Sequence, residues 1–173
     1  MLTSIIPNPL HPAIVHLPMA IVVLLPLTMA GALWAIKRGA APFRAWGVAA
    51  ALHATLVLSA WASLATGDPA KDQVEKVIAE APIETHEEAA EAFLVMAAGA
   101  LLFSAVGLRR DRIGTIARGT AAVGSVALFA AGWNVGHSGG ELVYGLNAGA
   151  AYATTGGAAQ PAATAMRERD DDR

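Results

Sequence analysis

Histidine is the residue best suited to carry chemistry in this 173-residue chain, which has five histidines and no cysteine. Without thiols there can be no disulfide, thiolate metal site, covalent c-type haem link or cysteine nucleophile. An imidazole can bind haem iron or a metal ion, or transfer a proton near neutral pH. Histidine and carboxylate side chains must therefore supply any site chemistry.

Long apolar segments position these histidines. Crossing a hydrocarbon core takes roughly 20 apolar helical residues, and 55% of the chain is hydrophobic while 15% is charged. We therefore expect an all-α membrane protein, a four-transmembrane-helix bundle. The expected spans cover about residues 12–36, 43–66, 86–108 and 113–136.

A short amphipathic helix is expected on the membrane interface between the second and third spans. Asp68 and Pro69 form an N-cap and a first helical position, and apolar residues follow at helical spacing among charged ones. We expect this helix to stop before Pro82. Residues 1–145 then form one transmembrane domain, and residues 146–173 a low-complexity tail that we expect to be disordered.

Two local signals refine the spans. Pro18 and Pro26 lie inside the first span and should kink it, because proline removes a backbone donor. Thr85 and Glu88 have the spacing of a capping box, which would start the third span at His86.

The distribution of basic residues predicts the orientation, because lysine and arginine in short loops favour the cytoplasm. Seven of them flank one side of the expected bundle: Lys37, Arg38, Arg44, Arg109, Arg110, Arg112 and Arg118. The connection between the second and third spans is acidic and carries two lysines. We expect a multi-pass protein of a bacterial inner membrane with both termini in the periplasm.

On this topology the histidines gather toward the outer face. His16, His86 and His137 fall at similar depth on three different spans, whereas His53 lies roughly 20 Å deeper. A b-type haem needs two imidazoles from facing helices at similar depth, beside small residues such as the glycines at 132, 136 and 140. These four histidines are the candidate cofactor ligands, with His53 serving a second site or a proton path. His11 is not expected to be a ligand.

A metal ion is the alternative. Zn or Cu needs three or four ligands at about 2 Å, and His16, His86 and His137 could provide them together with Glu87 or Glu141. Each feature also has a purely structural interpretation. A single histidine in a first turn is commonly a hydrated interfacial group, and glycines at intervals of four commonly form a helix-packing face.

Four motifs resemble a known family: His11-Pro-Ala-Ile-Val-His16-Leu-Pro18, Thr66-Gly67, Thr85-His86-Glu87 and Gly136-His-Ser-Gly-Gly-Glu-Leu-Val-Tyr144. Together they resemble the bacterial membrane proteins grouped as domain of unknown function 2231. The resemblance implies four transmembrane helices. Some relatives are joined to c-type cytochrome or Rieske domains, which implies a redox setting. We expect no such fused domain here, and Gly145, Leu146 and Asn147 stand where other relatives place a histidine.

Three functions follow as hypotheses. The first is an electron-transfer protein that binds haem b and acts with a separate redox partner protein. The second is a non-catalytic structural or accessory membrane module, and the third is a divalent-metal binding protein. We expect no catalytic residues, because hydrolase and phosphate-loop motifs do not occur. The lipid bilayer is an expected partner and nucleic acid is not, while the oligomeric state, a homo-oligomer included, is left open.

Overall fold

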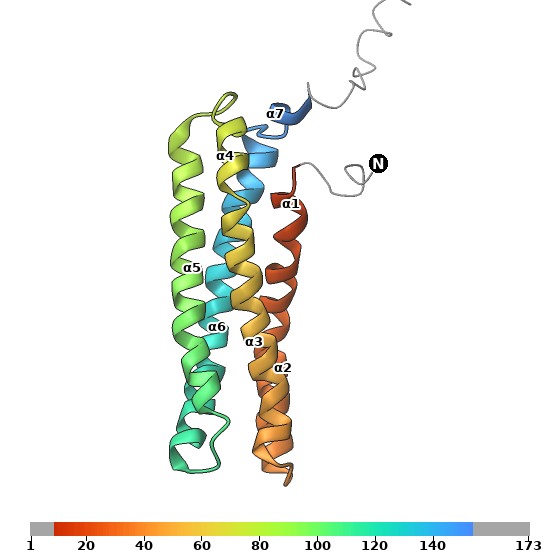
Figure 1. Ribbon diagram of the computed structural model, residues 1–173, viewed down its shortest axis with the longest axis vertical. Helices are drawn as coiled ribbons and strands as arrows, with labels where there is room; N and C mark the ends of the chain where they lie inside the picture. Colours follow the sequence, from red (N-terminus) through yellow and green to blue (C-terminus); the bar gives the residue numbers. More distant parts are fainter. Residues whose placement is uncertain (1–8, 154–173) are drawn as a thin grey trace, which may run out of the picture.

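Four long helices run side by side, alternating in direction, in the computed structural model, which describes residues 9–153 (Figure 1). They are α2 (His16–Lys37), α3 (Pro42–Ala65), α5 (Glu80–Val106) and α6 (Arg112–Gly140). Each lies in a segment long and apolar enough to cross a membrane. Neighbours in the bundle are α2 with α3, α3 with α5, α5 with α6, and α6 with α2. The expected all-α four-helix architecture of a multi-pass membrane protein is confirmed.

The short elements gather at one end of the bundle, at the top in Figure 1, which we call the α4 end. They are α1 (His11–Ile14), α4 (Asp68–Val74), the π-helical turn η2 (Glu141–Gly145) and α7 (Ala150–Ala153). The short helix expected between the second and third spans is present as α4, but it ends at Val74, and turns follow it before α5 begins. Residues 146–153 are structured and include α7, so the expected disordered tail does not begin at residue 146. Residues 154–173 lie outside the described part of the chain.

The first span is interrupted where a proline predicts it. The regular helical hydrogen bonding is interrupted at Val15, between α1 and α2, although Val15 keeps helical backbone angles. Pro18 has no amide proton to donate to the Ile14 carbonyl, and its ring crowds that turn. Pro26, in contrast, lies inside α2, which continues past it.

The third span begins earlier than expected. Helix α5 starts at Glu80, so Pro82 lies in its first turn, where a missing amide proton costs no hydrogen bond. The expected capping box is wrong, because the Thr85 hydroxyl donates to the Ala81 carbonyl at 2.9 Å, one turn back. His86 consequently lies inside the helix and not at its start.

Buried residues repeat at intervals of three and four along α2, α3 and α6, as in coiled-coil packing. In α2 they include Pro18, Val22, Leu25, Met29 and Ala32. Large apolar side chains cover much of the outer surface of the bundle, including Trp34, Trp61 and Trp133. A membrane would surround such a surface with hydrocarbon.

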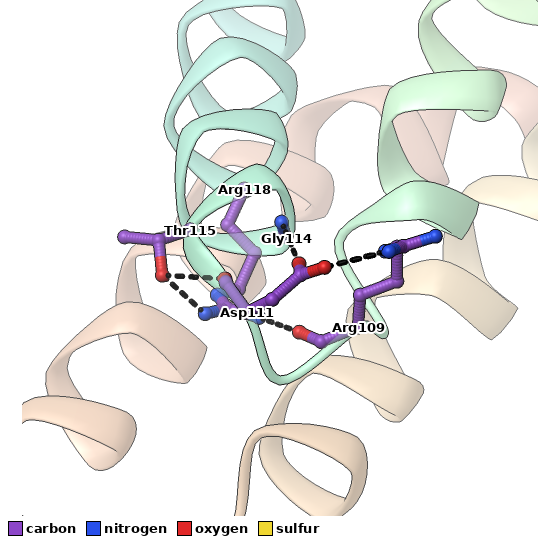
Figure 2. A network of polar contacts seen from close by, with 5 residues as sticks. All are labelled: Arg109, Asp111, Gly114, Thr115 and Arg118. Carbon is purple, nitrogen blue, oxygen red and sulfur yellow. Dashed lines mark hydrogen bonds and ion pairs between the residues drawn. The ribbon is translucent and has the colours of Figure 1, made fainter.

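The connection from α5 to α6 is fixed by an arginine buried at the end opposite α4 (Figure 2). Arg118 is 4% exposed, and its guanidinium donates to the carbonyls of Gly107 at 2.6 Å and Arg109 at 2.9 Å. Asp111 caps α6 by accepting from the Gly114 amide at 2.9 Å and pairs with Arg109. Arg118 thus satisfies carbonyls that the end of a helix leaves unpaired.

Candidate functional site

A cavity of about 530 Å³ lies at the α4 end, between the ends of the long helices. Its wall is mostly apolar, with Ile83, Phe93 and Val135 among the lining residues. The polar side chains on it are few, and two of them are the imidazoles of His11 and His86. A mostly apolar cavity with a few polar groups is the usual form of a small-molecule or cofactor site.

His11 is held by the backbone of α3. Its Nδ1 lies 2.9 Å from the Ser63 carbonyl oxygen. A carbonyl only accepts, so Nδ1 must carry the proton and donate it. In the neutral ring the other nitrogen, Nε2, is then the unprotonated one and keeps its lone pair.

His86 is held in the same way by α6. Its Nδ1 lies 2.9 Å from Ser138 Oγ, and the Ser138 hydroxyl donates its only proton to the Val135 carbonyl at 3.0 Å. With the Ser138 proton on that carbonyl, the imidazole donates from Nδ1 to Ser138, and Nε2 again keeps its lone pair. His86 also packs closely on α6, because a Cβ added to Gly139 would lie 3.0 Å from His86 Cε1.

The two imidazoles belong to one site. Both line the same cavity. In metal and haem sites the ligating histidine usually donates its second ring nitrogen to a carbonyl or similar acceptor, which fixes the tautomer. His11 and His86 both show that arrangement.

The other expected ligands lie elsewhere. His16 and His137 lie at the α4 end, as expected. Their side chains, however, are exposed on the outside of the bundle, and so is that of Glu141. Glu87 does line the cavity, where its carboxylate contacts Lys71 Nζ at 2.8 Å. The structure therefore does not bring the expected metal ligands together, and residues 9–153 contain no group of three or more His, Cys, Asp and Glu that could hold a metal ion.

His53 is deep in the bundle, as expected, and is fully buried. Its Nε2 lies 3.1 Å from the Ala97 carbonyl and must donate to it, so Nδ1 accepts from Ser104 Oγ at 2.8 Å. Both ring nitrogens are thereby engaged in linking α3 to α5. No lone pair is left for a cofactor, and we interpret His53 as a structural residue.

The expected site omitted His11, although the sequence contains a signal for it. Pro18 and Val22 are buried positions of α2. His11 lies seven residues before Pro18, which places it on the same side of the helix. In α6 the same step of seven leads from Gly132 to Gly139. His16 and His137 fall between these positions and therefore face outward. Helical phase therefore separates the residues that face the cavity from those that face outward, which depth along the span does not.

The glycines of α6 are partly as expected. Gly132 packs against Val22 and Phe93, and Gly136 packs against Met19, so both lie on a close packing face. At Gly140, however, an added Cβ would meet no atom within 4 Å. Gly139 takes the place that was expected for Gly140, because it faces His86.

Comparison of the chain with protein-family models, curated proteins and solved structures gave no match.

Proposed function

We propose that the protein binds haem b in the cavity at the α4 end through His11 and His86, and that it takes part in electron transfer in a membrane. One observation carries the proposal. Two imidazoles line a single cavity, and each has its Nδ1 proton donated to oxygen, so that Nε2 can act as a ligand. Bound haem would supply one-electron chemistry, tuned by these two axial ligands.

Size and shape support this occupant. Sites for small molecules and cofactors measure roughly 300–1000 Å³, and this cavity measures about 530 Å³. A flat macrocycle needs a wall without bulky side chains, and α6 lines the cavity with Gly132, Gly136 and Gly139. The donor set and the wall therefore fit haem better than they fit a Zn or Cu ion, which would need more ligands.

The charged residues of the cavity determine how the acidic groups of haem would be placed. Lys71 is the only lysine or arginine that lines the cavity within residues 9–153. Its ammonium already contacts Glu87 and lies 3.9 Å from Glu75. The propionates would then extend into water at the α4 end or displace Glu87 from Lys71. In the expected orientation that end faces the periplasm, where a separate redox partner would reach the haem.

The test is the visible absorption spectrum of protein purified in detergent from haem-replete cells, oxidised and then reduced with dithionite. We expect a Soret band and sharp reduced α and β bands, with about one haem extracted per chain. The matched control is the His11→Ala/His86→Ala double variant, purified identically, which should be colourless. A colourless unaltered protein, or equal haem in both proteins, would contradict the proposal.

A further inference from the structure

Helix α4 forms part of the cavity wall without belonging to the core. Asp68, Ala70, Lys71 and Val74 of this helix line the cavity. None of its seven residues is buried. Segments with little buried apolar contact open at low free-energy cost. On this side the cavity wall is therefore formed by α4, a helix that is not packed into the core of the bundle.

Side-chain contacts hold α4 in place instead. Lys71 Nζ lies 2.8 Å from Glu87 Oε2 on α5, and the two side chains are 29% and 33% exposed. On the other side, the Tyr152 hydroxyl of the α7 segment donates to the Ala70 carbonyl at 3.4 Å. The ion pair is the shorter contact, and it joins α4 directly to the helix that carries His86.

Turns flank α4 on both sides. Thr66 and Gly67 lie between α3 and α4, and Pro69 in the first turn of α4 has no amide proton with which to continue the hydrogen bonding of α3. After α4, the chain passes through turns before α5 begins at Glu80. A short helix between two such segments can move as one body while α3 and α5 stay packed.

We propose that α4 is a movable cover over the cavity, that the Lys71–Glu87 ion pair holds it closed, and that the occupant enters from the aqueous side at the α4 end. The inference rests on the proposed function only for the identity of that occupant. Opening separates Lys71 from Glu87 and exposes the cavity, while the four long helices keep their contacts.

The chain contains no cysteine, so one introduced thiol reports on access to the cavity. Ala60 on α3 lines the cavity and is 8% exposed, which makes Ala60→Cys a reporter of small size change. Its reaction rate with a membrane-impermeant maleimide, measured in proteoliposomes or detergent, follows opening of the cover. This readout needs no haem.

We expect Lys71→Gln and Glu87→Gln each to speed labelling of the reporter roughly two- to fivefold, the range for a partly exposed ion pair. The charge swap Lys71→Glu/Glu87→Lys should return the rate toward that of the reporter alone. Lys76→Gln is the matched control, because Lys76 is exposed and bonds Gln73 in the same segment. It should leave the rate unchanged.

Equal labelling rates in Lys71→Gln, Glu87→Gln and the reporter alone would contradict the proposal that α4 covers the cavity. So would a charge swap that labels as fast as the single variants, because the effect would then not belong to the pair. Faster labelling in a protein that proves colourless would support the cover while refuting haem as the occupant. The two proposals therefore fail separately.

Discussion

His86 on α5 lies directly against the backbone of α6 at Gly139, where an added Cβ would come within 3.0 Å of the imidazole Cε1. The neighbouring Gly140 has open space at the corresponding position. We predict that Gly139→Val displaces His86 and lowers haem affinity about tenfold or more, the size of effect seen when a ligand loses its support. Haem extracted per chain, after titration with limiting haem, measures this.

Gly140→Val is the control, because it brings the same β-branched residue into the same turn without meeting a side chain. It should bind haem as the unaltered protein does. Equal losses of haem in the two variants would mean that valine acts by disturbing the helix. The contact between Gly139 and His86 would then not determine haem binding.

The buried histidine gives a prediction about stability. His53→Leu removes hydrogen bonds to Ser104 and to the Ala97 carbonyl, and we expect the free energy of unfolding to fall by about 1–3 kcal/mol. Haem content should not change, because both ring nitrogens are already engaged. Denaturant unfolding in detergent measures the first effect and absorbance the second. His137→Leu, at an exposed position, should leave stability unchanged; loss of haem from His53→Leu would restore this residue as a ligand.

The bundle was predictable because hydrophobicity and length determine membrane spans. The four apolar segments and the short helix at Asp68 appear in the structure. The start of the third span was less predictable, because a proline such as Pro82 commonly ends a helix. A proline in a first turn lacks only a proton that would have no partner there, so α5 begins at Glu80 instead of His86.

The site was only partly predictable. Depth along the span places His86 and His137 at the same end of the bundle. Only helical phase shows that His86 lines the cavity and that His137 is exposed. The partners of the imidazoles, the Ser63 carbonyl and Ser138, depend on how α1 and α5 pack against other helices. A single sequence does not contain that register. Membership of the family that the motifs resemble stays a prediction.

The cap of α6 gives the chain a specific acid sensitivity. The Arg109 guanidinium, followed by the Gly114 amide, lowers the pKa of Asp111 from 3.8 to about 2. A carboxylate with a lowered folded pKa stabilises the fold above its unfolded pKa and loses that contribution as pH falls through the folded value. We therefore predict that Asp111→Asn lowers the thermal midpoint at pH 5 to 7, and that the difference vanishes as the pH approaches about 2.

Thermal unfolding in detergent across this range measures the effect. Asp72→Asn is the matched control, because Asp72 is exposed on α4 and far from this cap. A difference between Asp111→Asn and the unaltered protein that persists unchanged at the lowest pH would show that charge is not the cause.

We propose that His11 and His86 form one site, and that the exposed His16 and His137 at the same end of the bundle take no part in it. The most direct measurement is the reduced absorption spectrum and haem content of four single variants, His11→Ala, His86→Ala, His16→Ala and His137→Ala, purified in parallel. We predict that the first two lose the α band and most of the haem, and that the last two keep both. Loss of haem from His16→Ala or His137→Ala, with His11→Ala retaining it, would contradict the account.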